Sequence, residues 1–539
     1  MKWFSQLNKK IDIATWAAII FFLCLFVLGF MICSDYGMSW DEPEQVYIGQ
    51  LNAKYAVRGN PELLEIRNRW YGPSFEIFLY AVRDRSNTQQ MYLSRHLWTF
   101  IAFFVCCIFF YLLARRITKH NVLALIGTVF LVISPRIFAN SFYNSKDIPF
   151  LVLYCMSILS MVWFLDKQTI WRGLFHALIT AAAITIRLPA IIIPAFTLLG
   201  LGIEMVNQRI NWKAVIISSM LYLIVTTGFV ILFWPALWTE PWQGFLSAFE
   251  LMSKHPNGIN MLFMGNIISS FNMPWFYIPV WIAISTPLLY LIAFIPGLFN
   301  IIYNQKNWIK KEISLERRDE VLILLAFFMP LLTVILLHSY LYDAWRQMFF
   351  VYPAFLLISI KGLQWAWQQL NNRLTKTMSL GLASIILLIG MLPVCLWMVK
   401  NHPYQNIHFN QFAGKDMQTI QQHYMLDFWG LAYREGIEAI LNMDDSAHIQ
   451  ILVETPPGQF ALKILAQEEA NHIQAIAPED NTDYFIGNYY MIAEPYPYKN
   501  EVYTVKVDHA KILSVYRLSE EEKSIYFNPI ENRRELETP

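Results

Sequence analysis

Carboxylates gather in the segment SDYGMSWDEPEQ, which places Asp35, Asp41, Glu42 and Glu44 directly after the first apolar run of the chain. Anionic side chains are costly to desolvate, so three of them within four positions beside an apolar run need a reason. A carboxyl group that is partly shielded from water has a raised pKa and can act as a general base. Ser39 with Glu42 also fits a capping box at a helix start, and this structural reading stays open.

Three further groups combine cations with acids. The segment FYNSKDIPF holds Lys146 and Asp147, Arg187 lies between two apolar runs, and HSYLYDAWRQMFFVYP holds the side chains His338, Tyr340, Asp343 and Arg346. Arginine binds phosphate with two parallel hydrogen bonds and keeps its charge at any physiological pH. Two structural readings stay open: Asp147 can cap a helix, and Arg187 can reach out to lipid phosphates. Together the groups predict a site that takes a proton and holds a phosphate.

The elements that position these groups are membrane helices. Of the 539 residues, 56% are hydrophobic and 15% charged, whereas soluble chains carry about 25% charged residues. A spanning helix needs about 20 mostly apolar residues. The apolar stretch from 174 to 205 is too long for one crossing, and Arg187 before Pro189 predicts a break there. We therefore predict eleven spans, at 13–32, 97–113, 122–137, 148–165, 174–186, 188–205, 214–233, 277–298, 321–337, 348–360 and 378–398.

Lysine and arginine predict the sidedness of these spans, because cytoplasmic loops carry an excess of both. With a cytoplasmic N-terminus, the inside loops hold most of these cations, and the short outside loops hold only Lys146, Arg187, Lys254 and Arg346. The four ionisable groups then meet at the outer boundary of the membrane. The chain from residue 400 onward lies outside, in a periplasm or its equivalent.

The chain divides into a transmembrane module over 1–399, with large outer loops at 34–95 and 234–276, and a soluble outer domain over 400–539. The second loop holds His255 and the aromatic stretch WPALWTEPW, which also fits simple anchoring at the lipid headgroups. Of 41 basic and 40 acidic residues, 11 and 21 lie from Lys400 onward. The outer domain is therefore acidic, and we expect its glutamate-rich end to be loosely ordered.

A small α/β unit is predicted for the outer domain, with a helix at 426–441 and strands at 448–454, 483–489, 501–507 and 512–518. None of the six cysteines lies in this domain, so no disulfide framework is predicted. The sequence shows no glycine-rich phosphate loop followed by lysine, and we expect no nucleic-acid partner.

The residues resemble the GT-C glycosyltransferases, in the class of protein O-mannosyltransferases and lipid A aminoarabinose transferases. The resemblance rests on Asp41-Glu42 in the first outer loop, on Lys146-Asp147-x-Pro149, on Arg187-Leu-Pro189 and on Arg346 followed by Pro353. The tail elements HPYQ, DFWG and YREG resemble bacterial relatives. No outer loop can hold the β-trefoil insertion of eukaryotic mannosyltransferases, so the resemblance favours a multi-pass enzyme of a bacterial inner membrane, with a GT-C-like fold.

The resemblance implies an inverting transfer of a sugar, hexose or pentose, from a polyprenyl-phosphate donor to an acceptor hydroxyl on a lipid, glycan or protein. Asp41 would take the acceptor proton and Glu42 would orient Asp41 or the acceptor. Arg187, Arg346 and Lys146 would stabilise the leaving phosphate, and we add Asp147, His255, His338, Tyr340 and Asp343 as supporting residues. Whether a divalent cation, magnesium- or manganese-like, binds near Asp41 and Asp147 stays open.

Two other classes of protein compete with this reading. A transporter or flippase of lipid-linked sugars would place charges near the bilayer midplane on helices related by internal repeats, whereas here the ionisable residues gather at one surface and no repeat is visible. A membrane-anchored sensor would need neither eleven spans nor four ionisable groups in outer loops.

Overall fold

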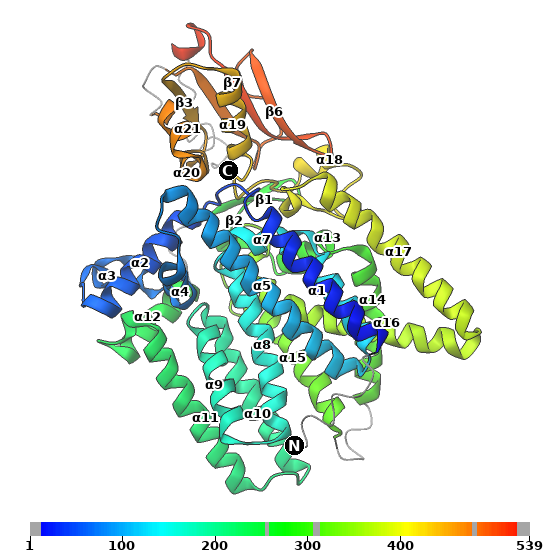
Figure 1. Ribbon diagram of the computed structural model, residues 1–539. Helices are drawn as coiled ribbons and strands as arrows, with labels where there is room; N and C mark the ends of the chain where they lie inside the picture. Colours follow the sequence, from blue (N-terminus) through cyan, green and yellow to red (C-terminus); the bar gives the residue numbers. More distant parts are fainter. Residues whose placement is uncertain (1–11, 254–257, 306–312, 477–481, 525–539) are drawn as a thin grey trace.

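The computed structural model describes residues 12–253, 258–305, 313–476 and 482–524. A bundle of helices carries a small domain at one end (Figure 1). Among the described residues, eight helical segments are long and apolar enough to cross a membrane. They are α1 (Ile13–Ile32), α5 (Thr88–Thr118), α8 (Asp147–Asp166), η3 (Leu188–Ile191) with α10 (Ile192–Val206), α11 (Trp212–Phe233), α15 (Leu315–Leu336), η6 (Arg346–Val351) with α16 (Tyr352–Arg373), and α17 (Lys376–Lys400).

Other apolar helices are shorter or bent. Helices α6 (Asn121–Val132) and α7 (Pro135–Tyr143) meet at 66° and together pass the same test as one broken span. Helices α9 (Ile170–Ile184) and α14 (Leu288–Gln305) are also apolar but shorter. The chain is therefore a polytopic α-helical membrane protein, as predicted, and the number of eleven spans stays a prediction.

Two further breaks in the long apolar runs lie at prolines. The expected break at Arg187 is present, because α9 ends at Ile184 and η3 starts at Leu188. The run 277–298, predicted as one span, is divided into α13 (Tyr277–Ser285) and α14. Proline disfavours helical backbone in the residue before it, and Pro287 follows Thr286, which is extended with φ −92° and ψ 138°.

Helix α8 connects two clusters of charges at opposite ends of the bundle. It starts at Asp147 and ends at Asp166, a length of about 30 Å at 1.5 Å per residue. At the Asp166 end, the guanidinium of Arg318 donates to Asp166 and Glu204, each at 2.8 Å. This second cluster was not predicted, because we used the arginines of the inside loops only to assign topology.

The predicted outer loop 34–95 is largely helical. It holds α2 (Glu42–Arg58), α3 (Glu62–Glu65), η2 (Arg67–Trp70) and α4 (Ser74–Val82). These helices project from the bundle beside α12 (Pro241–Ser253; Figure 1). Its predicted end is too late, because α5 begins at Thr88, where the Asn87 side chain accepts from the Gln90 amide at 2.8 Å. The polar first turns of α5 hid this start from the apolar pattern.

The second predicted loop, 234–276, combines short helices with a hairpin. It holds η4 (Pro235–Leu237), α12 (Pro241–Ser253), the antiparallel strands β1 (Asn260–Phe263) and β2 (Asn266–Ser269), and η5 (Ser270–Asn272).

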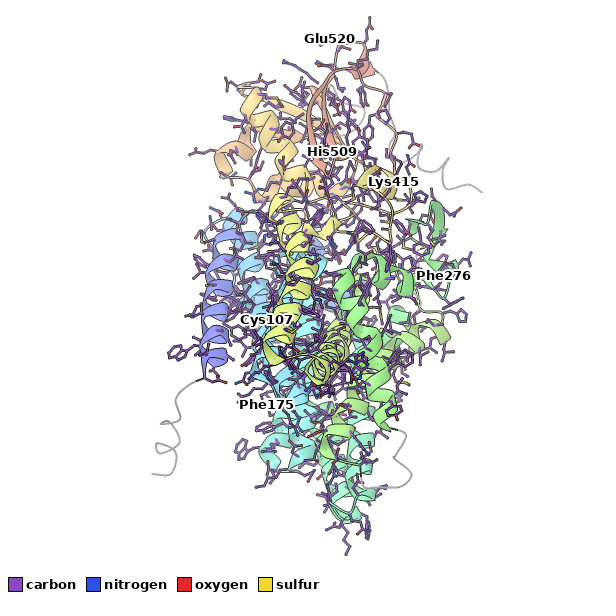
Figure 2. The ribbon with its side chains drawn as sticks, turned by 90° about the vertical axis from the view of Figure 1, so that its right-hand side faces the viewer. Cys107, Phe175, Phe276, Lys415, His509 and Glu520 are labelled. Carbon is purple, nitrogen blue, oxygen red and sulfur yellow. The ribbon has the colours of Figure 1, made fainter. Side chains whose placement is uncertain are left out.

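After α17 the chain forms a small domain around a five-stranded sheet of order β4-β3-β5-β7-β6. Strands β3 (Ile449–Val453), β5 (Tyr484–Asn488), β6 (Glu501–Val507) and β7 (Ala510–Arg517) confirm the four predicted strands, and β4 (Ile473–Ala475) was not predicted. The helical elements are η7 (Gln405–Ile407), α18 (Met417–Gln421), α19 (Tyr433–Met443), α20 (Pro456–Ala461), η8 (Leu462–Ile464), α21 (Gln467–His472) and η9 (Glu522–Ser524). Figure 2 shows Glu520 at the far end of this domain and Cys107 inside the bundle.

One predicted helix of this domain starts too early. Helix α19 begins at Tyr433 rather than at 426, because the preceding residues form a turn in which Gly430 has a φ of +72°. Helical backbone needs a negative φ, so the turn ends any continuation toward the N-terminus. The glutamates at 531, 535 and 537, in the expected loosely ordered end, lie outside the described residues.

Candidate active site

Arg346 is the centre of the ionisable cluster at the end of the bundle next to the small domain. It begins η6, and its side chain is 2% exposed. One terminal nitrogen, Nη1, donates to Asp41 Oδ2 at 2.9 Å and to Asp147 Oδ2 at 3.3 Å. The other, Nη2, donates to Asp343 Oδ2 at 3.0 Å. Three acids from distant parts of the chain thus share one guanidinium.

Asp147 lies deepest in this cluster. It occupies the first turn of α8, where the Asn144 side-chain oxygen accepts from its backbone amide at 2.9 Å, and the Asn144 amide donates to Asp147 Oδ2 at 2.9 Å. The other oxygen, Oδ1, forms an ion pair with Arg187, and the carboxylate is 1% exposed. Asp147 therefore fixes the positions of Arg187 and Arg346 and is closed to a substrate.

Asp41 is the most exposed acid of the cluster. Its side chain is 31% exposed, and it lies at the N-cap position of α2 without making a side-chain cap bond. It borders a polar pocket of about 360 Å³. The pocket is lined by Asp41, Glu44, Gln45, Ile48, Arg67, Asn68, Tyr71, Lys146, Leu251 and Tyr342.

Lys146 brings a second kind of cation to this pocket. Its ammonium nitrogen lies 3.9 Å from the centre of the Tyr71 ring. Burial and the neighbouring Arg187, against the opposing pull of Asp41, lower the pKa of Lys146 to about 8. The side chain therefore changes its charge close to neutral pH, unlike the two arginines.

The turn before Arg346 is strained. Asp343 and Ala344 have φ values of +54° and +63°, a conformation that costs about 1–3 kcal/mol outside glycine and persists only where the surroundings hold it. The Asp343–Arg346 ion pair is one such contact. Burial raises the pKa of Asp343, while the Arg346 cation opposes this rise.

Glu42 is held by Ser39 and His96. Its Oε2 accepts from the Ser39 amide at 2.7 Å and from the Ser39 hydroxyl at 3.1 Å, and its Oε1 lies 2.9 Å from His96 Nε2. Both oxygens are engaged, and the residue is 2% exposed. These contacts hold Glu42 against the turn before α2 and against His96, while the N-cap of α2 is Asp41. The orientation of Asp41 or of the acceptor by Glu42 stays a prediction.

Two other supporting residues, His338 and Tyr340, do not join the cluster. His338 lines a separate cavity of about 570 Å³, between η5, α13 and the end of α15. The Tyr340 ring packs edge-on against Phe271 with centres 5.1 Å apart. His255 lies outside the described residues.

A divalent cation does not fit these side chains. Within the described ranges, no three His, Cys, Asp or Glu side chains are arranged to hold a metal ion. Asp41, Asp147 and Asp343 converge on the guanidinium of Arg346 instead, so the positive charge that they need is already present.

The sequence patterns missed two aromatic contacts to Arg346. Its guanidinium carbon lies 4.7 Å from the ring centre of Trp429, in the small domain, and 5.0 Å from that of Tyr342. A cation over an aromatic face is attracted by the ring's electrons. The available signal was the DFWG segment, a tryptophan-containing turn in an otherwise soluble part of the chain.

A known protein family matches the part of the chain that holds Lys146, Asp147 and Arg187. Residues 86–238 match the family model of dolichyl-phosphate-mannose-protein mannosyltransferases, a segment that includes Lys146, Asp147 and Arg187. The resemblance to the GT-C glycosyltransferases is confirmed over this segment. Asp41 and Arg346 lie outside the matched GT-C segment, and their link to it is the ion-pair cluster itself.

Solved structures similar to this GT-C-like chain include two of ArnT from Cupriavidus metallidurans. The one bound to undecaprenyl phosphate has a TM-score of 0.48 and 10% sequence identity, over 94% of this chain and 98% of that one. The apo structure has the same score and identity, over 93% and 98%. A comparison with curated proteins gives no match.

Proposed function

We propose that this protein transfers a sugar from a polyprenyl-phosphate donor to an acceptor hydroxyl at the outer face of a membrane. The observation that carries the proposal is the convergence of Asp41, Asp147, Arg187 and Arg346 beside a polar pocket at one end of the helix bundle. The family whose model matches residues 86–238 is named for a lipid-phosphate sugar donor. The lysine and arginine distribution assigns this end to the outside.

The cations supply a place for the donor phosphate. Lys146 lines the pocket, and the charges of Arg187 and Arg346 act on it from nearby. The Nε atoms of both arginines are buried and have no hydrogen-bond partner among the described residues. Charge-assisted hydrogen bonds from such groups hold a phosphate strongly. An isoprenoid tail can lie in the lipid next to the apolar helices while the phosphate enters the pocket.

Asp41 is the acid that we expect to take the acceptor proton, because it is the most exposed acid of the cluster and, of the three acids paired with Arg346, the one that lines the pocket. In the proposed step the acceptor oxygen attacks the anomeric carbon and its proton passes to Asp41. The bond from that carbon to the phosphate oxygen breaks, and its electron pair leaves with the lipid phosphate. Attack from the face opposite the phosphate inverts the anomeric centre. General-base help of this kind contributes roughly 10²–10⁴ in rate.

Arg346 links phosphate binding to the base. Its Nη1 is paired with Asp41 at 2.9 Å, so this pair must open before Asp41 can receive the acceptor proton. A phosphate that accepts the hydrogen bond that Nη1 now donates to Asp41 releases Asp41 toward the acceptor. Arg346 keeps its bonds to Asp147, from Nη1, and to Asp343, from Nη2. The growing negative charge on the leaving phosphate is then met by fixed cations.

The test is turnover of purified protein in lipid nanodiscs, with a panel of undecaprenyl-phosphate sugars and a bacterial lipid extract as acceptor. We expect wild-type protein to release undecaprenyl phosphate, and Asp41→Asn to fold normally and lose activity by roughly 10²–10⁴. The exposed Glu65 on α3 gives the matched control, and Glu65→Gln should keep normal turnover.

Turnover of Asp41→Asn within a few-fold of wild type would remove Asp41 from the base role. Movement of the intact donor across a sealed bilayer, without release of the carrier phosphate, would instead identify the transporter or flippase.

A further inference from the structure

The turn formed by residues 427–431 ties the small C-terminal domain to the site. Its backbone reverses at Gly430, and the Asp427 carboxylate accepts from the Ala432 amide at 3.0 Å. Burial raises the pKa of Asp427 to about 6. The turn thereby presents Trp429, which is 1% exposed, to the helix bundle.

The Trp429 ring packs against the guanidinium of Arg346. The Arg346 guanidinium lies 4.7 Å from its ring centre, and the Tyr143 ring of α7 packs edge-on against it at 5.7 Å. The indole Nε1 has no hydrogen-bond partner among the described residues. The ring face, rather than the N–H group, is therefore the part of Trp429 that acts on Arg346.

The same turn also holds the segment that leads to Asp41. A Cβ atom on Gly37 would collide with the Leu431 carbonyl oxygen, so only glycine allows the two backbones to approach this closely. Arg434 donates to the carbonyl oxygens of Ser34 and Tyr36, the latter at 3.2 Å. One short turn thus contacts both the guanidinium and the segment of the base.

We propose that the C-terminal domain is a built part of the transfer site, in which Trp429 is a positioning residue that keeps Arg346 aimed at the donor phosphate. This inference rests on the proposed function, because it assigns the C-terminal domain a role in binding the lipid phosphate. A domain that served only as a tether would not need to bury an aromatic ring against the arginine that three acids already hold.

The test compares Trp429→Leu, which keeps apolar volume, with Trp429→Phe, which keeps an aromatic face. The readouts are the affinity for undecaprenyl phosphate in nanodiscs, kcat and KM for the donor, and the melting temperature. We expect Trp429→Leu to weaken binding about tenfold to thirtyfold, the worth of a desolvated cation–π contact. Trp429→Phe should stay within about threefold of wild type, since no hydrogen bond is lost.

Trp397 offers a matched control, because it is also a tryptophan at the domain junction but contacts His408, at 4.8 Å between ring centres, rather than the site. We expect Trp397→Leu to lower the melting temperature while undecaprenyl phosphate affinity stays normal.

Three results would overturn the inference. They are normal affinity and kinetics in Trp429→Leu, equal losses in Trp429→Leu and Trp429→Phe, or the same loss in Trp397→Leu. If wild-type protein itself neither binds undecaprenyl phosphate nor turns over, the proposed function fails first, and the two failures are thereby distinguished.

Discussion

Replacing Arg346 separates the catalytic part of the cluster from its structural part. In Arg346→Met, three carboxylates lose the cation that lies 2.9, 3.3 and 3.0 Å from them. Removing one partner of a buried ion pair costs about 3–5 kcal/mol, because a charge is left uncompensated. Asp147, at 1% exposure, bears most of this cost, and its pair with Arg187 limits it. We therefore expect a clear fall in melting temperature together with a loss of transfer.

The fall in turnover expected for Arg346→Met can be estimated separately from its fall in stability. One electrostatic donor to a developing negative charge contributes about 10²–10³ in rate, so donor turnover by Arg346→Met should fall by that factor. Adding Asp147→Asn removes the excess buried negative charge but also takes the carboxylate from Arg187, so the double variant should regain part of the lost thermal stability and none of the lost rate. Melting curves and undecaprenyl phosphate release on the same preparations measure both. Recovery of activity along with stability would mean that Arg346 only holds the fold, and would refute the reasoning.

Two further predictions concern Lys146 and Glu42. Because burial sets the pKa of Lys146 to about 8, its cation is present below that pH, so undecaprenyl phosphate affinity should fall as pH rises through 8. Lys146→Arg should flatten this fall in binding titrations, and an unchanged pH profile would contradict the assignment. Glu42→Ala removes the bonds to Ser39 and His96 and should lower the melting temperature. We expect the donor KM, and the kcat per folded molecule, to stay unchanged. A selective loss of kcat at a normal melting temperature would mean that Glu42 takes part in catalysis.

The membrane part of the fold was predictable because its cause is local. Apolar runs near 20 residues must satisfy their own backbone hydrogen bonds in lipid, so they form helices. The break at Arg187–Pro189 follows from the same short-range rules. Those rules also explain the errors: the run 277–298 has a proline in its middle, and α5 extends beyond its apolar portion because Asn87 caps it.

The grouping of Asp41, Asp147, Arg187 and Arg346 was predictable for a different reason. Each lies at an end of an apolar run, and alternating helices bring such ends to one face. Sidedness gives no orientation of side chains, so the sequence left open which acid is exposed and whether Glu42 caps a helix or serves Asp41. The exposures of 31% for Asp41 and 1% for Asp147 come only from the packed structure.

The contact of Trp429 with Arg346 lay beyond the reach of sequence patterns. It depends on how the C-terminal domain docks onto the bundle, and the residues are 83 positions apart (429 less 346) with no periodic pattern between them. The strained backbone at Asp343 and Ala344 was also not predictable, because neither residue type favours a positive φ strongly.

The most direct test of the central claim is an electron cryo-microscopy map of the wild-type protein with undecaprenyl phosphate in nanodiscs. We predict phosphate density within hydrogen-bond reach of Arg187, Arg346 and Lys146, in the pocket that Asp41 borders, with the isoprenoid chain running toward the lipid. Phosphate density at another place, such as the cavity lined by His338, with the Asp41–Arg346 pair intact and the pocket empty, would contradict the account.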